Sequence, residues 1–377
     1  MQTITENTTI IKATLPERDP TKKQEVFYNP IMSSNRNISI LLLNSISNKD
    51  MNIALPLAGS GIRGLRFLKE LKKEKINKLF VNDKKENFVE VFNENLKLNE
   101  ISKKTIKEKI CIHYEDANLF LLNQIKHPET KSFCGYFDYI DIDPFGTPNP
   151  FISAAISRIT RNGVIAITAT DTAALTGTYL KVTKRKYWAV SLKNYMMHET
   201  GLRILIRKIQ LQGIQFDKAL IPILSYHKDH YFRIYFISEK SKEKCDQIIK
   251  QHQYLLFCSK CLNHEASNYN SNICQCGEKF QYAGPLWTGD LFNKELISTM
   301  AKNNPFPEEQ KFLDILKEES KKDMVGFYDL HSIAKNYRSE PRRMDIIMKK
   351  LKAVKTHFSP NGIKTDKNIK EIVKLIK

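Results

Sequence analysis

The sequence lacks any long hydrophobic run. A helix that crosses a membrane needs ~18 or more consecutive apolar residues, and no segment of the 377 residues reaches that length. The first 24 residues, MQTITENTTIIKATLPERDPTKKQ, also lack the basic end and apolar stretch that are typical of a secretory leader. We therefore expect a soluble, cytoplasmic protein with no membrane association.

Acidic residues are scarce compared with basic ones. The chain has 41 Asp and Glu against 60 Lys and Arg, which gives a formal net charge of +19. This excess favours a polyanionic partner, with nucleic acid as the first candidate. The alternative is a lysine-rich, solvated surface that binds nothing. The sequence indicates no obligate protein partner.

Cysteine is also infrequent. The seven cysteines are an odd number without the spacing of a disulfide framework. Four of them form two close pairs, Cys258-x2-Cys261 and Cys274-x-Cys276, with 12 residues between the pairs. Four thiolates at such spacing predict a structural, tetrahedral Zn²⁺ site. The tight second pair leaves two alternatives open, His264 as a substitute ligand or a loop of reduced cysteines.

Short apolar runs alternate with amphipathic segments in the first part of the chain. The predicted strands are residues 52–58, 78–83, 109–117, 135–146, 163–171, 218–229 and 230–239, and helices are predicted at 61–74 and 86–99. This alternation predicts an α/β fold with a doubly wound, mostly parallel sheet. Such a sheet binds its ligands at the carboxyl ends of its strands.

The composition changes after Ser238. A charged helix at 239–253 leads into the cysteine cluster, and helices follow at 307–320, 327–337 and 340–353. We predict a domain at 1–240 and a smaller C-terminal α+β domain at 241–377. The second domain has a cysteine knuckle at about 255–285 and a winged-helix-like region at about 307–377, which suits RNA or only a structural role.

A glycine loop follows the first predicted strand of the alternating region. Gly59, Gly61 and Gly64 match the pattern G-x-G-x-x-G, and Asp83 ends the next strand. Glycines permit a tight turn close to a ligand. An acid at the end of the strand that follows such a loop typically binds ribose hydroxyls. The loop fits a dinucleotide and S-adenosylmethionine equally well. Asp116, followed by Ala117, suits an adenine amine, a helix N-cap, or both.

The fourth predicted strand ends in the sequence Asp143-Pro144-Phe145-Gly146. A carboxylate and a carbonyl at this place can accept the N–H groups of an exocyclic base amine, and an aromatic ring can stack on the base. These groups suit methyl transfer to such an amine, which is a poor nucleophile and becomes cationic as it attacks. The alternative is a turn in which Asp143 only caps backbone N–H groups.

Several long sequence words resemble the tRNA (guanine-26 N2)-dimethyltransferase family over nearly the whole chain. They are VFYNPIMSSNRNISI, PLAGSGIRGLRF, DIDPFGTPNPF, TATDTAALTG, HETGLRIL, GPLWTGDLF and THFSPNGIKTD. The resemblance implies a class I methyltransferase fold, S-adenosylmethionine as the methyl donor and tRNA as the substrate. It implies a transferase that methylates the N2 amine of guanine to N2-methyl- and N2,N2-dimethylguanine.

The same resemblance implies roles for individual residues. Arg36 and Arg66 are expected near the methionine carboxylate of the cofactor, Asp83 at the ribose, and Asp116 with Ala117 near the adenine. Asp143 is expected as the catalytic carboxylate, and Phe27 and Phe145 are expected to flank the target guanine. The chain departs from the family at Val354-Lys355, where Ser-Arg is frequent, and this puts a phosphate contact there in doubt.

Residues 176–208 combine many Lys and Arg side chains with four aromatic residues, Tyr179, Tyr187, Trp188 and Tyr195. Basic groups suit phosphates and aromatic rings suit unstacked bases, but an amphipathic helix pair with core aromatics has the same pattern. For the whole chain the alternative functions are a non-catalytic RNA-binding protein, a nicotinamide dehydrogenase and another nucleic-acid amino-methyltransferase.

Overall fold

The computed structural model describes residues 1–15, 24–123, 135–322, 324–340 and 343–376. The chain divides into two compact units. The first comprises residues 1–169, 235–239 and 302–309, and the second comprises 170–234, 240–301 and 310–377. Among the described residues, no helix has the length and apolar character that a membrane span requires. The functional domains at 1–240 and 241–377 stay a prediction.

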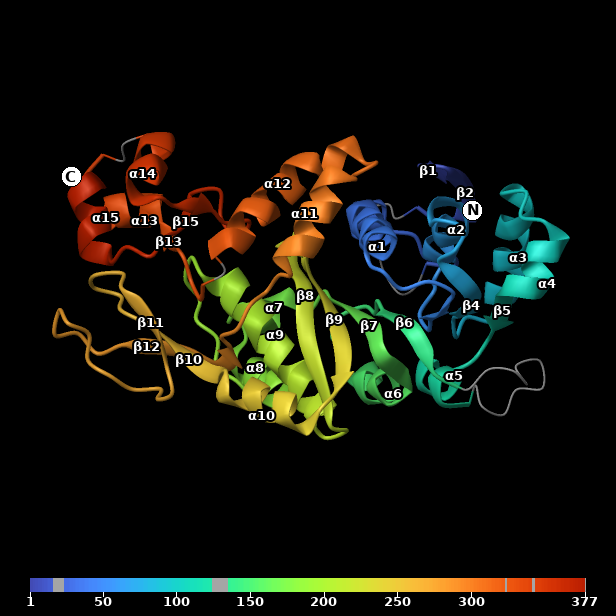
Figure 1. The fold of residues 1–377 in the computed structure, drawn as a ribbon, viewed down its shortest axis with the longest axis horizontal. Helices are drawn as coiled ribbons and strands as arrows, with labels where there is room; N and C mark the ends of the chain where they lie inside the picture. Colours follow the sequence, from blue (N-terminus) through green and yellow to red (C-terminus); the bar gives the residue numbers. More distant parts are fainter. Residues whose placement is uncertain (16–23, 124–134, 323, 341–342, 377) are drawn as a thin grey trace. The chain divides into compact units, whose positions relative to one another are not determined.

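A seven-stranded sheet in the order β5-β4-β3-β6-β7-β9-β8 forms the main layer of the fold (Figure 1). Neighbours from β5 to β7 are parallel. This confirms the predicted doubly wound α/β sheet. The strands are β3 (Met51–Leu55), β4 (Ile76–Asn82), β5 (Ile110–His113), β6 (Phe137–Ile142), β7 (Ile159–Ala169), β8 (Lys218–Lys228) and β9 (Tyr231–Lys240).

The parallel strands of the first unit are buried and rich in Ile, Val, Leu and Phe, as expected for strands with helices on both faces. The helix predicted at 61–74 stops at Glu70, because Leu71 takes an extended backbone conformation. The remaining elements are β1 (Gln2–Glu6), β2 (Thr9–Ala13), α1 (Ser33–Ser45), α2 (Ile62–Glu70), α3 (Phe88–Leu98), α4 (Lys103–Lys109), α5 (Ala117–Asn123) and α6 (Ile152–Arg158).

Buried Asn82 joins the carboxyl ends of three strands. Its amide nitrogen donates to the Pro56 and Glu115 carbonyls, both at 3.0 Å, and its side-chain oxygen accepts from the Glu115 N–H at 3.0 Å. An unpaired backbone group at this depth would cost free energy. Asn82 therefore fixes the segments that follow β3, β4 and β5.

The second unit contains two small antiparallel sheets, β11-β10-β12 and β13-β15-β14, together with helices (Figure 1). This confirms the predicted α+β character of the C-terminal part. The strands are β10 (His252–Phe257), β11 (His264–Ser267), β12 (Gln281–Trp287), β13 (Tyr328–Asp329), β14 (Val354–Lys355) and β15 (Gly362–Lys364).

The helices of this unit follow the predicted pattern with two corrections. They are α7 (Thr172–Leu175), α8 (Leu180–Tyr187), α9 (Met197–Ile214), α10 (Lys242–Lys250), α11 (Lys294–Lys302), α12 (Gln310–Glu319), α13 (Leu330–Asn336), α14 (Met344–Leu351) and α15 (Ile369–Ile376). The helix predicted at 239–253 is too long, because β9 runs to Lys240 and β10 begins at His252. The predicted helical start at 327–329 is wrong. Tyr328 and Asp329 form β13, and the Asp329 side chain caps α13 by accepting from the Ser332 N–H at 2.8 Å.

A buried ion network holds the second unit together. Lys364 lies 3.3 Å from Glu199 and 3.4 Å from Glu319, and all three side chains are almost fully buried. Glu199 also pairs with Arg203 at 2.9 Å. Glu319 accepts hydrogen bonds from Thr356 Oγ1 at 2.6 Å and from the His357 N–H at 2.8 Å. Burial acts to raise the pKa of Glu319, but His357 and Lys364 outweigh it and lower this pKa to about 2.

Glu319→Gln should destabilise the protein, because it leaves Lys364 with one carboxylate fewer in a dry interior. Removing one partner of a buried ion pair typically costs about 3–5 kcal/mol. A depressed pKa contributes stability above the ordinary carboxyl pKa of 4.5 and loses it as pH falls toward 2. Between pH 7 and pH 3.5, the free energy of unfolding measured in urea should therefore fall more for wild type than for the variant. An equal fall in both proteins would contradict the ion pairing of Glu319 with Lys364.

Candidate active site

Four segments predicted to form the site follow the carboxyl ends of neighbouring parallel strands. The glycine loop follows β3, Asp83 follows β4, Asp116 lies three residues after β5, and Asp143 follows β6. The strand order reverses between β3 and β6, so this edge contains the topological switch point of the sheet. Ligands of doubly wound folds bind at such a point. The sheet thus brings these acidic residues to one edge.

The glycine loop is tied to Asp83 by hydrogen bonds. The Gly59 N–H donates to Asp83 Oδ2 at 2.8 Å, and the Lys85 N–H donates to Oδ1 at 3.1 Å. Burial raises the pKa of Asp83, against the opposing effect of these N–H groups. Gly61 has φ +78°, and a Cβ there would lie 2.1 Å from the Phe92 ring. Only glycine fits the turn at Gly61.

Asp116 caps the helix that carries Ala117. Its Oδ1 accepts from the Asn118 N–H at 2.9 Å and from the Leu119 N–H at 3.3 Å. Ala117 is buried and begins α5. The helix-cap role predicted for Asp116 is present, and its second oxygen makes no hydrogen bond that the structure records for these residues. A role at an adenine stays a prediction.

Arg63 lies between two carboxylates. Its Nη2 donates to Asp143 Oδ2 at 2.5 Å, and its Nη1 lies 3.4 Å from Asp141 Oδ2. Tyr139 donates its hydroxyl to the same Asp141 oxygen at 2.6 Å. Arg63 Nη1 also donates to Ser39 Oγ at 2.8 Å, and Nη2 donates to Asn35 Oδ1 at 2.9 Å. Arg63 therefore fixes the orientation of Asp143 and neutralises the buried Asp141.

The Asp143 turn and the glycine loop bring two aromatic rings together. Phe27 and Phe145 have ring centroids 4.5 Å apart at an interplanar angle of 69°. The Phe27 carbonyl accepts from the Ser60 N–H at 3.1 Å. Pro144 is buried, whereas Phe145 and Gly146 are partly exposed. Gly146 has φ +79°, which turns the chain away behind the ring. Phe27 and Phe145 are adjacent, as expected for residues of one site.

Arg36 and Arg66 share a different carboxylate, that of Glu6. Arg36 pairs with both oxygens of Glu6, and Arg66 Nη1 lies 2.8 Å from Oε1. Arg66 is fully buried and also pairs with Glu70 at 2.7 Å. Burial acts to raise the pKa of Glu6, but Arg36 and Arg66 together lower it. Both guanidiniums are thus neutralised within the protein, and their contact with a cofactor carboxylate stays a prediction.

The four clustered cysteines converge in the second unit. One potential ligand atom from each of Cys258, Cys261, Cys274 and Cys276 lies within 4.8 Å of all the others. The Sγ–Sγ distances are 3.4 Å between Cys258 and Cys276 and 3.5 Å between Cys261 and Cys274. Tetrahedral Zn–S bonds of about 2.3 Å place sulfur atoms roughly 3.8 Å apart. The geometry fits a four-sulfur site.

His264 is not part of this sulfur group. Its ring packs against Tyr328, with centroids 4.6 Å apart. Burial lowers the pKa of His264 to about 4. Burial raises the pKa of the Cys258 thiol, whereas the Glu278 N–H and the neighbouring thiols lower that of Cys276 to about 7. His264 as a substitute ligand is therefore unnecessary, because the four cysteines already provide four donors.

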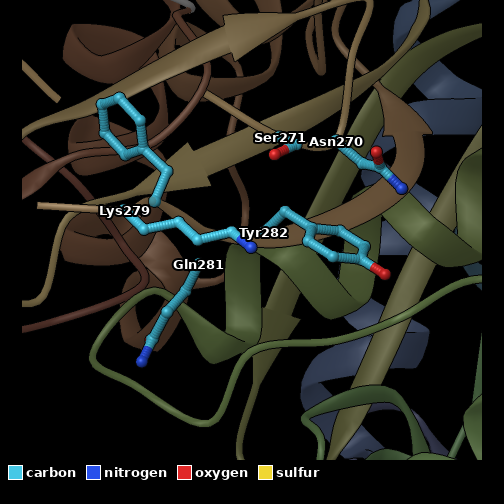
Figure 2. A pocket seen from close by; sticks show the side chains of 6 residues that line it. Asn270, Ser271, Lys279, Gln281 and Tyr282 are labelled. Carbon is cyan, nitrogen blue, oxygen red and sulfur yellow. The ribbon is translucent and has the colours of Figure 1, made fainter. Parts of the chain in front are cut away.

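A hollow of about 370 Å³ lies beside the cysteine knuckle (Figure 2). Figure 2 shows Asn270 and Tyr282 extending to the same side and Gln281 pointing away from them. The hollow is lined by Asn270, Ser271, Lys279, Phe280, Gln281 and Tyr282. None of the residues predicted for the cofactor or for catalysis lines this hollow, so it is distinct from the candidate active site.

The chain matches the family model "N2,N2-dimethylguanosine tRNA methyltransferase" over residues 4–377. The chain belongs to this family. A relative from Aquifex aeolicus, named tRNA (guanine(26)-N(2)/guanine(27)-N(2))-dimethyltransferase, is 37% identical over 97% of this chain and 93% of its own. A relative from Methanobrevibacter smithii, named tRNA (guanine(26)-N(2))-dimethyltransferase, is 37% identical over 98% and 95%.

A solved structure of the same fold supports the family assignment. Trm1 from Pyrococcus horikoshii, in complex with S-adenosyl-L-methionine, has a TM-score of 0.84 and 30% identity, and the match covers 100% of both chains. The resemblance that the sequence words indicated is confirmed. In this member of the N2,N2-dimethylguanosine tRNA methyltransferase family, Asp143 directly follows β6. Arg63 orients it, and the sequence did not indicate that cation.

Arg63→Gln should lower the stability of this methyltransferase, because two carboxylates would then face each other without their shared cation. The expected loss in the free energy of unfolding is about 3–5 kcal/mol. Adding Asp141→Asn removes one of the two negative charges and should recover part of that loss. Urea unfolding of wild type, the single variants and the double variant checks this coupling. Strictly additive effects would show that Arg63 and Asp141 act independently.

Proposed function

We propose that this chain transfers methyl groups from S-adenosylmethionine to the exocyclic N2 amine of guanine 26 in tRNA, giving N2-methyl- and N2,N2-dimethylguanine. The observation that supports it best is the position of Asp143, whose carboxylate follows β6 and is fixed by Arg63. Family membership and the likeness to Trm1 in complex with the same cofactor support it further.

Asp143 has the chemistry that an aromatic amine requires. The N2 lone pair of guanine is delocalised, so the amine needs acceptors for its N–H groups before it attacks. Asp143 Oδ2 is held by Arg63, and its side chain is 22% exposed, which leaves the carboxylate accessible to a base. The Pro144 carbonyl provides a second acceptor. As the nitrogen becomes cationic, Asp143 stabilises the charge and accepts the released proton.

The glycine loop and Asp83 are proposed to hold the cofactor. Bound S-adenosylmethionine supplies an electrophilic methyl group at its sulfonium. Asp83 uses one lone pair of each oxygen on backbone N–H groups, so both oxygens retain acceptor capacity for ribose hydroxyls. Ser60 Oγ is buried without a hydrogen-bond partner among the described residues. This unpaired hydroxyl, between Gly59 and Gly61, fits a loop that gains a polar ligand.

Phe27 and Phe145 are proposed to flank the target guanine, and they must separate to do so. Rings whose centroids lie 4.5 Å apart leave no space for a base between them. The backbone of Phe27 is tied to the glycine loop through Ser60. Phe145 precedes Gly146, where a Cβ would meet nothing within 4 Å. Rotation of the Phe145 ring is thus the movement that admits a base with the smallest disturbance.

Zn²⁺ is proposed at the four cysteines as a structural ion, because no ligand position is left for a substrate. Cys258 and Cys274 lie in a small buried cluster with Leu256 and Phe280. A small hairpin with so few apolar contacts gains rigidity from a metal. We also propose that the protein acts in the cytoplasm, where its tRNA substrate is found, with the net charge of +19 favouring that polyanion.

The function is tested by mass spectrometry of bulk tRNA nucleosides after incubation with the full chain and labelled S-adenosylmethionine. Wild type should produce labelled N2-methylguanosine. Asp143→Asn keeps the shape of the side chain but loses the charge, so the single-turnover rate should fall by about 10²–10⁴-fold. Binding of the cofactor, measured by calorimetry, should stay near the wild-type value.

Asp83→Ala is the matched control, because it should fail at a different step. Loss of a charged hydrogen-bonding group should weaken cofactor binding by about 1.5–3 kcal/mol, with tRNA binding retained. A wild-type chain that binds tRNA but transfers no label would favour the alternative, a non-catalytic RNA-binding protein on this fold. Near-normal methyl transfer by Asp143→Ala would reduce Asp143 to a turn-capping residue.

The purified chain should contain about one zinc ion per molecule. Cys276→Ser should lose the ion and unfold at a lower temperature, since structural zinc contributes directly to folding. Cys111→Ser, in β5 and outside the cluster, should retain both the ion and the stability. Elemental analysis together with thermal unfolding checks this, and a metal-free wild type with unchanged stability after chelation would exclude the site.

A further inference from the structure

The segment that contains α8 and the start of α9 has an unusual charge pattern. Residues 172–198 contain no acid and five cations: Lys181, Lys184, Arg185, Lys186 and Lys193. The structure separates its four aromatic residues into two kinds. Tyr187 is fully buried, and Tyr195 packs against Phe257 and Phe327. Tyr179 and Trp188 are exposed by 59% and 51%. Only the second pair is accessible to a ligand.

Trp188 is held in an unusual conformation. It ends α8 with φ +54° and ψ +40°, the left-handed region that glycine normally occupies. Its N–H donates to the Lys184 carbonyl at 3.1 Å, and its own carbonyl accepts from Arg207 at 3.4 Å. A bulky residue in this region is a true outlier, and such strain is often kept for function. The left-handed backbone thus ends α8 with a half-exposed ring.

A cation covers one face of the Trp188 ring. Lys208 Nζ lies 3.0 Å from the ring centroid, and Lys208 itself is buried. Burial, with Arg207 next to it, lowers the pKa of Lys208 to about 8. A ring backed by a cation on one side and half exposed to solvent can accept a flat, electron-rich partner on the other side.

A row of cations extends along α8 from this ring. Lys181, Lys184 and Arg185 are exposed, and their spacing from Trp188 by seven, four and three residues places them on one helix face. The nearest acid in the sequence is Asp171, which already pairs with Lys186 at 2.8 Å and with the Tyr187 hydroxyl at 3.2 Å. No acid of the segment therefore neutralises the row.

We propose that Trp188 and the exposed cations Lys181, Lys184 and Arg185 form a stacking platform for an unpaired base of the tRNA substrate. Trp188 stacks on the base, and the cations contact the phosphates on either side of it. An acid-free cationic row beside an exposed aromatic ring is an arrangement by which proteins bind single-stranded nucleic acid. This inference rests on the proposed function, because it takes tRNA as the ligand.

The first test uses tryptophan fluorescence, because the chain has only two tryptophans. Trp287 is 5% exposed and donates its Nε1–H to the Asp290 carbonyl at 2.9 Å, so the accessible signal comes from Trp188. Titration of the full chain with purified tRNA should quench this signal and protect it from acrylamide. Trp188→Phe should lack the quenchable component. Binding and methylation of tRNA with unchanged tryptophan fluorescence would overturn the platform and leave the proposed function intact.

The second test compares three variants of the full chain. Trp188→Gly removes the ring but suits the left-handed backbone, so its unfolding temperature should not fall. Its affinity for tRNA should drop by roughly 5- to 100-fold, the usual effect of losing one stacking side chain. Trp188→Phe should recover part of that affinity. Phe216→Leu, an exposed aromatic residue next to Asp217, is the matched control and should bind tRNA as wild type does.

Wild-type tRNA affinity in Trp188→Gly would overturn the inference. A lower unfolding temperature with a matching loss of affinity in Trp188→Gly would also overturn it, because the ring would then be structural. Absence of tRNA binding in wild type would instead contradict the proposed function itself. Affinity for S-adenosylmethionine should be the same in all variants, since Trp188 belongs to neither the glycine loop nor the Asp143 turn.

Discussion

The ion pairs of Arg63 are the interaction on which the candidate active site depends. Two carboxylates, Asp141 and Asp143, come from one strand end, and a buried carboxylate without a partner is too costly for a folded protein to keep. Arg63 is supplied by the helix that follows the glycine loop. The same side chain thus joins the helix after the glycine loop to the Asp143 turn, the two segments proposed to hold the cofactor and the base.

This arrangement restricts how Asp143 can act. One oxygen of Asp143 accepts from Arg63, so the proposed contact with a base falls to the other oxygen. In the proposed mechanism, the carboxylate therefore holds the amine, stabilises the developing cation and accepts the released proton through that second oxygen. What the geometry provides is the positioning of this carboxylate by Arg63.

Much of this site could be predicted from local sequence, and the rest could not. Gly59, Gly61, Asp83 and Asp143 follow predicted strands, so their common edge follows from the parallel sheet alone. Nothing in the local sequence marks Arg63, four residues after Gly59, as a site residue. Its partners lie 78 and 80 positions further along the chain. The pairing of Lys364 with Glu199 spans 165 positions. No periodicity encodes such contacts, which only the tertiary fold creates.

The positive net charge has a different meaning once the interior is known. Several buried cations have acids as partners: Arg66 pairs with Glu6 and Glu70, and Lys364 pairs with Glu199 and Glu319. These buried pairs neutralise themselves, so they do not account for the excess of 60 basic over 41 acidic residues. Composition alone could not distinguish a charged surface from a charged core. The buried ion pairs make that distinction, because their cations are already neutralised. The surface lysines and arginines stay available to phosphates.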